Sequence, residues 1–312
     1  MWKRVIVGAI LAAAAVAALV HYRESQPLRF ARLLWGRNER CSLGDVWRSL
    51  EANQRLWERI GEIAEGMKQI ESDPAGFELI EAGQQRFWVP GGNQTGLAEM
   101  LGEQEAEVYG AGGRGVRPGD VVLDCGANVG VYTRHALDAG ARLVVAIELA
   151  PENLTCLRRN FAPEIDAGRV IVYPKGVWDR DDELQLSTSR LSGGDSVALQ
   201  VPGSRQGPRV PLTTIDKLVE ELRLERIDLI KMDIEGSERR ALAGARQTVA
   251  RFRPRLAISL EHEPDDAEAI PALVRKLWPE LKTECGPCVW VHTALVNRAA
   301  PDVLFAGPVS PR

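Results

Sequence analysis

A carboxylate and two glycines follow an apolar stretch near the middle of the chain. Residues 121–123 read Val-Val-Leu, and Asp124, Gly126 and Gly130 come after them. The pattern predicts a buried parallel strand, a tight loop and a helix that begins near residue 131. Glycine lets the loop backbone approach a ligand closely, and the first N–H groups of the helix face the same crevice. The segment is therefore a candidate ligand-binding loop.

The residues of this loop favour a ligand with positive charge. A dinucleotide fold needs G-x-G-x-x-G after its first strand, but the corresponding positions hold Gly126, Asn128 and Val131. Asp124 would also repel a pyrophosphate, whereas the sulfonium and ammonium groups of S-adenosylmethionine suit a carboxylate there. Glu148 ends the next predicted strand. It can accept hydrogen bonds from the ribose hydroxyls there, or it can cap the following helix.

A second group of charged residues lies between positions 231 and 238. Lys231 and Asp233 are two residues apart, so they share one face of a predicted strand that is otherwise apolar. At the carboxyl end of a parallel strand they would face the crevice where open α/β sheets bind ligands. The alternative is a structural ion pair. Glu235 and Glu238 either join the same site or cap the next helix, and capping suits Glu238 better.

Only a parallel sheet would bring these residues together. Apolar runs alternate with helical ones after residue 120, which predicts right-handed crossovers and a mostly parallel sheet with helices on both faces. After the first strand, the predicted strands are 143–148, 170–177, 228–233 and 256–261, and the predicted helices are 151–161, 237–251 and 267–277. Residues 182–215 predict an insertion near the substrate side, and residues 289–306 predict a final antiparallel hairpin.

These motifs together resemble the FkbM-type methyltransferases. The matching segments are VVLDCGANVGVYT, VVAIELAPENLTCLRRN, VPLTTID, IDLIKMDIEGSERRALAGA and RPRLAISLEHEPDD, within about residues 118–275. The resemblance implies a class I, Rossmann-like methyltransferase fold that uses S-adenosylmethionine, usually to methylate a hydroxyl oxygen. The residues implied to hold the cofactor are Asp124, Gly126, Asn128, Gly130 and Glu148, and those implied at the reactive side are Lys231, Asp233, Glu235 and His262. At Glu261 many relatives carry another residue.

The implied reaction is an in-line attack of an acceptor oxygen on the sulfonium methyl group. Most of the rate then comes from alignment, but a hydroxyl acceptor also needs a base within hydrogen-bond reach. Asp233 or His262 could be that base. Lys231 could be the base if burial lowers its pKa, and otherwise it could orient an acidic or sugar substrate. A divalent cation held by Asp233 and a neighbouring acid is a further possibility.

Two other classes of function compete with methyl transfer. One is a catalytically silent, membrane-tethered module that keeps the nucleotide pocket as a scaffold or sensor. The other is a nicotinamide-dependent oxidoreductase, which Asp124 and the missing glycines disfavour. The acceptor is not readable from the sequence, and we expect a small molecule, a sugar or a lipid-linked glycan.

The N-terminal region divides into two predicted parts before the methyltransferase domain at 76–312. Residues 1–22 carry 16 uncharged residues after a basic start, which predicts a membrane anchor or, alternatively, a cleaved signal peptide. The arginines that follow predict a cytoplasmic catalytic domain, against export after cleavage. Residues 23–75 predict a helical stem, whose seam Leu56, Ile60, Ile63, Met67 and Ile70 either packs on the domain or forms a dimer.

Composition and cysteine usage narrow the remaining possibilities. Apolar residues make up 45% and charged residues 26% of the 312 residues, as in ordinary globular proteins. The net charge of −4 gives no reason to expect a nucleic-acid partner. Five cysteines do not suggest a disulfide framework. Cys285-Gly-Pro-Cys288 predicts a redox pair or two unrelated cysteines, and zinc is disfavoured because no second such pair exists.

Overall fold

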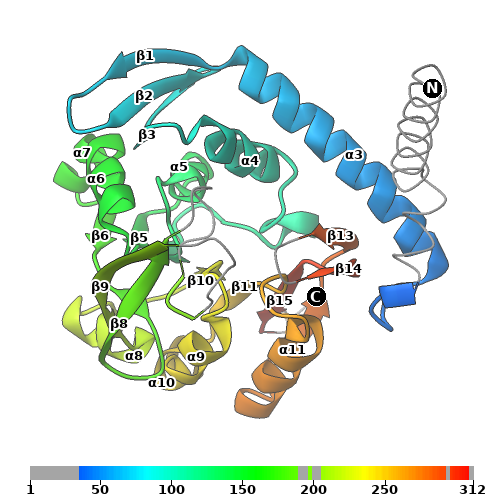
Figure 1. Ribbon diagram of the computed structural model, residues 1–312. Coiled ribbons are helices and arrows are strands. Elements are labelled where there is room, and N and C mark those ends of the chain that lie inside the picture. The colour runs from blue at the N-terminus through cyan, green and yellow to red at the C-terminus, as the bar shows by residue number, and fades with distance from the viewer. Residues whose placement is uncertain (1–34, 189–195, 199–204, 293–295, 309–312) are drawn as a thin grey trace, which may run out of the picture.

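A seven-stranded, mostly parallel sheet forms the centre of the computed structural model (Figure 1), which describes residues 35–188, 196–198, 205–292 and 296–308. Its strands lie in the order β12-β15-β11-β10-β4-β5-β6. The bounds are β4 Val121–Cys125, β5 Leu143–Ile147, β6 Val170–Tyr173, β10 Leu229–Met232, β11 Arg255–Ser259, β12 Lys282–Cys285 and β15 Val303–Gly307. The predicted α/β class and parallel sheet are confirmed.

The strand order creates a crevice between β4 and β10. From β4 the chain proceeds outward to β5 and β6, and then returns to β10 on the other side of β4, all by parallel pairing. Loops that follow β4 and β10 therefore diverge at their carboxyl ends, which is where sheets of this kind bind ligands. β15 runs antiparallel to β11 and β12 at the far edge. The predicted terminal hairpin is confirmed by β13 (Cys288–His292) and β14 (Asn297–Pro301).

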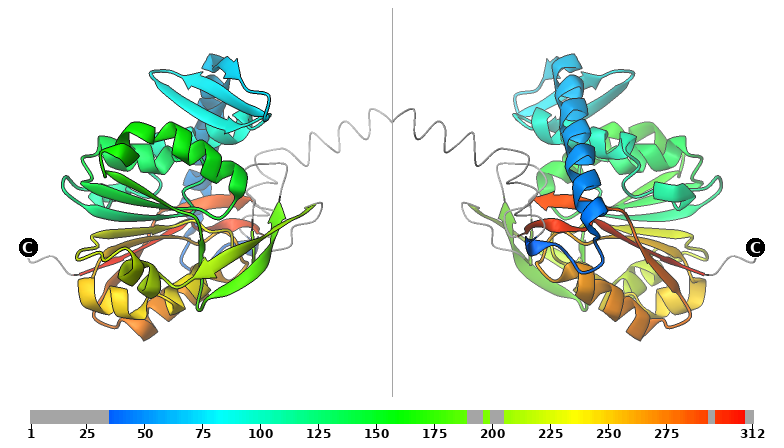
Figure 2. Two further views of the ribbon diagram at one scale, coloured as in Figure 1. Left: turned by 90° about the vertical axis from the view of Figure 1, so that its left-hand side faces the viewer. Right: turned by 90° about the vertical axis from the view of Figure 1, so that its right-hand side faces the viewer.

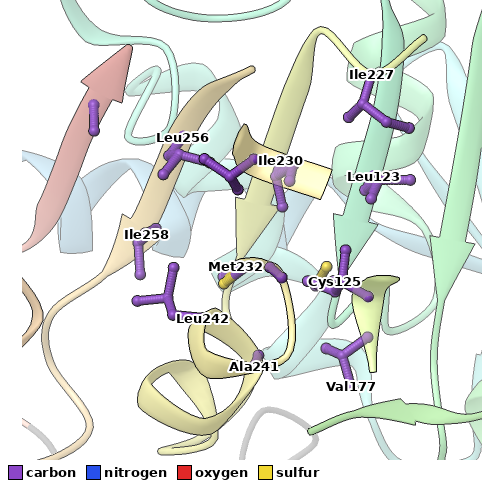
Figure 3. Packing of buried hydrophobic residues seen from close by; sticks show 14 of the residues in the cluster. Leu123, Cys125, Val177, Ile227, Ile230, Met232, Ala241, Leu242, Leu256 and Ile258 are labelled. Carbon is purple, nitrogen blue, oxygen red and sulfur yellow. The ribbon is translucent and has the colours of Figure 1, made fainter. Parts of the chain in front are cut away.

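Helices cover both faces of the sheet because its central strands are apolar on both faces (Figure 2). One face carries α8 (Ile215–Glu221), α9 (Glu238–Ala243), α10 (Arg246–Phe252) and α11 (Asp266–Leu277), and the other carries α5 (Val131–Asp138), α6 (Pro151–Asn160) and α7 (Ala162–Asp166). Figure 3 shows Cys125, Met232 and Ile258 from three neighbouring strands beside Leu242 of α9. Each such fully buried aliphatic side chain contributes roughly 1.5–3 kcal/mol.

The helix predicted over 237–251 is in fact two helices, α9 and α10. They are separated at Gly244, where a Cβ atom would lie 2.1 Å from the backbone oxygen of Trp178. The close approach of that neighbouring loop therefore requires glycine at this position, and glycine also weakens a continuous helix. Helical periodicity alone did not reveal the break.

The predicted insertion forms a small sheet beside the crevice. β7 (Gly176–Val177) pairs in parallel with β9 (Arg205–Thr213), and β8 (Asp182–Thr188) pairs antiparallel with it. Ser196, which lies between β8 and β9, donates a hydrogen bond from its hydroxyl to the backbone oxygen of Glu235 at 2.7 Å. The insertion thus reaches the loop after β10, as expected for a segment near the substrate.

The helical stem is shorter than its sequence pattern predicted. α3 (Leu43–Gly66) begins at a Ser42–Asp45 capping box and ends at Gly66. The chain then turns into β1 (Lys68–Ser72), so Met67 and Ile70 lie outside the helix and the predicted seam is wrong at its end. β1 pairs with β2 (Phe77–Ala82), and β2 with β3 (Gln85–Pro90), so the predicted boundary at residue 75 cuts through a sheet.

The described part of the stem packs on the rest of the domain. α3 lies against α4 (Gln94–Glu105), where a Cβ at Gly102 would come within 2.6 Å of Ile60. Figure 1 shows α3 running from β1 to the β13–β14 hairpin. The predicted anchor at residues 1–22 lies outside the described residues. Among the residues that are described, no helix is long and apolar enough to cross a membrane.

A disulfide joins the beginning of α3 to the C-terminal hairpin. Cys41 is bonded to Cys288 across 247 positions of sequence, whereas Cys285 stays free. The odd number of cysteines did not suggest a disulfide framework, and the described residues hold this one disulfide. Of the two alternatives for Cys285 and Cys288, the redox pair was wrong and two unrelated cysteines is confirmed. The partner of Cys288 is too distant in sequence for spacing to reveal it.

Removal of this bond should destabilise the protein. For a loop of this length, constraint of the unfolded chain contributes about 2–5 kcal/mol, so Cys288→Ser should lower the free energy of unfolding by an amount in that range. Urea unfolding with and without reductant measures the change. Cys285→Ser is the matched control and should change little. Equal stability of oxidised and reduced wild-type protein would contradict the assignment.

Candidate active site

A cleft opens where the chain order reverses, at the carboxyl ends of the parallel strands. The loops after β4, β5, β10 and β11 form one side, and α4 with the segment that follows it forms the other. The polar lining residues are Glu99, Glu103, Gln104, Tyr109, Asn128, Tyr132, Glu148, Asn153, Lys231, Asp233, Glu235, Ser237 and Glu261.

Glu148 organises one end of the cleft. Its Oε1 accepts hydrogen bonds from the backbone N–H groups of Leu149 and Ala150, both at 2.7 Å, and its Oε2 accepts one from Asn128 at 2.9 Å. Ala150 is the N-cap residue of α6, so the helix-capping interpretation of Glu148 holds in part. The same carboxylate lines the cleft and fixes the glycine loop against β5.

The two glycines of the loop are required for protein packing. Gly126 has φ of +81°, and a Cβ there would lie 1.8 Å from the backbone oxygen of Asp233. Gly130 has φ of +99°, and a Cβ there would lie 2.1 Å from Phe161. Only glycine combines these backbone angles with such close neighbours. Gly126 also lines the cleft, whereas Gly130 does not.

Asp124 supports the loop from behind. The carboxylate is fully buried, it is not among the lining residues, and its Oδ2 accepts a hydrogen bond from the hydroxyl of Thr133 at 2.7 Å. Its Oδ1 lies 3.4 Å from Nζ of Lys231. The charge predicted to face a cationic ligand is therefore turned toward a buried lysine.

Lys231 connects the loop after β4 with the loop after β10. Its side chain is 4% exposed, and Nζ donates a hydrogen bond to the backbone oxygen of Gly126 at 3.1 Å. Nζ also lies 3.8 Å from Asp233 and over the rings of Tyr109 and Tyr132 at 5.2 and 5.6 Å. Burial by itself would lower the pKa of Lys231, but Asp124 and Asp233 outweigh burial and raise it. Lys231 is therefore an ammonium ion and cannot act as the base.

His262 is surrounded by carboxylates. Its Nε2 lies 3.4 Å from Asp233 and 3.6 Å from Glu235, and its Nδ1 lies 3.0 Å from Glu238. The contact with Glu238 is an ion pair and not a well-aligned hydrogen bond. Burial opposes a charge on the imidazole, but Glu238 and Glu235 raise the pKa of His262 well above its ordinary value. A protonated imidazole holds these loops together and cannot accept a proton.

Asp233 and Glu235 both line the cleft, but their pKa values shift in opposite directions. Burial would raise the pKa of Asp233, yet Lys231 and His262 together lower it, and the hydroxyl of Tyr109 donates to the same carboxylate. Burial raises the pKa of Glu235, which His262 offsets only in part. The structure thus brings together Lys231, Asp233, Glu235 and His262, as predicted, and makes Asp233 a weakly basic carboxylate.

The sequence interpretation missed Tyr109 and Glu103, which face these residues from across the cleft, and assigned no role to Glu261. Burial and the nearby carboxylates of Glu261 and Asp233 raise the pKa of Glu103 well above its usual range. Burial raises the pKa of Glu261 to about 7. α4 lies outside the motif region, so no spacing pointed to it, whereas Glu261 stands beside His262 at the end of β11 and position alone could have indicated it.

One group of side chains has the donor types of a metal site. Asp233, Glu261 and His262 offer ligand atoms that all lie within 4.8 Å of one another. However, each oxygen of Asp233 already faces a cation, His262 at 3.4 Å and Lys231 at 3.8 Å. A divalent ion would have to approach two buried positive charges, which is costly at such distances. The electrostatics therefore do not fit a metal, although the ligand types do.

The sheet order, the glycine loop after β4 and the acid at the end of β5 together define an α/β protein with an acidic cleft at the point where the strand order reverses. Residues 124–286 match the family model described as the methyltransferase FkbM domain. The chain belongs to this family of methyltransferases, as the motifs predicted.

Two curated relatives carry names of oxygen methyltransferases. The chain is 31% identical over 157 residues to the 31-O-demethyl-FK506 methyltransferase FkbM of Streptomyces tacrolimicus, covering 41% of this chain and 60% of that protein. It is 26% identical over 154 residues to the 2-O-methyltransferase NoeI of Sinorhizobium fredii strain NGR234, covering 44% of this chain and 62% of that one. The chain thus spans about three fifths of these relatives.

A solved structure of the family is also similar. The methyltransferase FkbM from Methylobacillus flagellatus KT matches with a TM-score of 0.45 and 20% identity. The match covers 81% of this chain and 59% of that one.

Loss of the buried ammonium should destabilise the fold. Lys231→Met removes the ammonium group that faces the buried Asp124, and loss of one partner of such a buried pair should lower the free energy of unfolding by about 3–5 kcal/mol. Urea unfolding of Lys231→Met, Asp124→Asn and the double variant forms a cycle in which the double variant should lose less than the two single losses added together. Lys282→Met, at an exposed ion pair, is the control. Strict additivity would show that the pair is not coupled.

Proposed function

We propose that this protein transfers the methyl group of S-adenosylmethionine to a hydroxyl oxygen of an uncharged, hydroxyl-rich acceptor such as a sugar. The observation that carries the proposal is the lining of one cleft, which combines Glu148 and the loop 126–128 with a group of acids. In this proposal the cofactor binds beside Glu148 and the loop, which we call the cofactor end, and the acceptor binds beside the acids, which we call the acceptor end. Membership of the methyltransferase family supplies the reaction class and implies the cofactor.

The cofactor end suits an adenosine with a cationic sulfur. Three backbone N–H groups already fix the carboxylate of Glu148. The side chain therefore loses little conformational entropy when a ribose binds. The carboxylate of Glu148 would repel a pyrophosphate, which needs backbone N–H donors in its place. When bound, S-adenosylmethionine supplies an electrophilic methyl group, and the residues of the cleft align an acceptor with it.

The acceptor end favours an uncharged substrate. Glu99, Glu103, Asp233, Glu235 and Glu261 line it, and Lys231 is the one basic residue among its described lining residues. Lys231 is almost fully buried against Asp124 and Gly126, so its ammonium group interacts with these residues and not with a ligand. A carboxylate or phosphate on the acceptor would face acids without a compensating cation, whereas hydroxyl groups can hydrogen-bond with them. The proposal therefore gives Lys231 no role in orienting an acidic substrate.

The names of the two relatives agree with an oxygen acceptor, since each describes O-methylation. A lipid-linked glycan remains part of the proposal only through the predicted anchor at residues 1–22. The cytoplasmic location also remains a prediction, and the Cys41–Cys288 disulfide favours the alternative of an oxidising compartment. The thiol state of Cys41 in intact cells, read by alkylation and mass spectrometry, distinguishes these locations.

The direct test does not require the identity of the methyl acceptor to be known. Purified protein, S-adenosylmethionine labelled in its methyl group and an extract of cells that lack the gene should yield a labelled product of neutral charge. Because the proposed reaction uses no divalent ion, the transfer should persist in EDTA. Cofactor binding without any labelled product would instead support the catalytically silent scaffold, and an anionic labelled product would contradict the proposed acceptor.

Substitution of Glu148 should weaken cofactor binding selectively. Glu148→Ala removes the carboxylate to which the ribose hydroxyls would donate hydrogen bonds, and each bond to a charged group is worth about 1.5–3 kcal/mol. We expect the affinity for S-adenosylmethionine, measured by calorimetry, to fall about 10- to 100-fold. Glu152→Ala, on the first turn of α6 and outside the cleft, is the control. Unchanged affinity of Glu148→Ala would remove this residue from the cofactor site.

A further inference from the structure

The proposed reaction releases one proton, and a residue must take that proton up. When the acceptor oxygen forms its bond to the methyl carbon, the carbon–sulfur bond breaks and its electron pair stays on sulfur, which becomes a neutral thioether. The hydroxyl proton must then pass to a base, and the sequence favoured Asp233 or His262 for that role. The geometry described above excludes His262 and Lys231, because carboxylates hold both side chains in their protonated forms.

We propose that Glu261 is the general base that removes the proton from the acceptor hydroxyl. This inference rests on the proposed function and adds a catalytic residue to it. The first support is position: Glu261 follows the end of β11, lines the acceptor end of the cleft, and offers a carboxylate oxygen within 4.8 Å of Asp233 and His262. It therefore lies among the residues that the sequence had placed at the reactive side.

The second support is the state of the neighbouring acids. Asp233 is a weak base, because each of its oxygens faces a cation and Tyr109 donates a hydrogen bond to it. Glu103 faces the same group from α4, and burial together with the nearby carboxylates of Glu261 and Asp233 raises its pKa well above its usual range. A raised pKa favours the neutral carboxyl group, which donates a hydrogen bond.

The pKa of Glu261 suits a general base that works near neutral pH. Burial raises its pKa to about 7; His262 opposes the shift, whereas Asp233, Asp302 and Glu235 add to it. Tyr109 and Glu103, on the facing segment, also interact with this carboxylate. A base is most effective when its pKa lies near the working pH. After the transfer, Glu261 carries the proton until it passes to solvent through the open side of the cleft.

The pH dependence has a definite sign. Below a pH of about 7 Glu261 is protonated and cannot accept, so the rate of label transfer should rise about tenfold per pH unit and level off above that value. Glu261→Gln should reduce the rate at pH 8 by about 10²- to 10⁴-fold and should abolish the acidic limb. Its affinity for S-adenosylmethionine should stay within about twofold, which also shows that the variant is folded.

Two further variants complete the test. Glu261→Asp keeps a carboxylate and should retain both measurable transfer and the acidic limb, so it remains informative if Glu261→Gln does not fold. Glu263→Gln makes the same change two residues away, outside the cleft, and should leave the rate unchanged. An acidic limb that persists in Glu261→Gln, or a rate within tenfold of wild type, would overturn the role of Glu261. Absence of any label transfer by the wild-type protein would instead overturn the proposed function.

Discussion

The ammonium group of Lys231 is the charge on which the site depends. It is buried between β4 and β10, where Asp124, Asp233 and the backbone oxygen of Gly126 surround it. A lone buried lysine would be costly, but here two carboxylates stabilise the charge. In return the lysine fixes both loops at the point where the chain order reverses. The loops after β4 and β10, which both line the cleft, are therefore held together by one side chain.

A second consequence is that the pKa values of neighbouring carboxyl groups in the cleft differ. Lys231 and His262 lower the pKa of Asp233, whereas burial raises the pKa of Glu103 and of Glu261. Side chains of the same chemical type therefore differ in how readily they bind a proton. The difference arises from partners on other elements, chiefly Lys231 on β10 and Tyr109 after α4.

Local signals in the sequence predicted much of this arrangement. Continuous apolar runs identified β4, β5, β10 and β11, and the acids and glycines at their ends located the cleft, because parallel strands present their carboxyl ends together. Long-range features were beyond such reasoning. The partner of Cys288, the break at Gly244 and the wall formed by α4 depend on contacts between distant segments. The predicted seam failed at Ile70 because sheet pairing with β2 overrode helical periodicity. Glu261 stood at a strand end that the sequence had located, but it received no role because many relatives carry another residue at that position, and its raised pKa arises from burial in the folded protein.

The Cys41–Cys288 bond also changes the covalent topology of the chain. It closes residues 41–288 into a ring that contains every strand of the central sheet except β15. A single cut by a protease in an exposed loop of this ring would therefore open the ring without releasing a fragment. The two halves of the sheet would stay parts of one molecule, and only reduction would separate them.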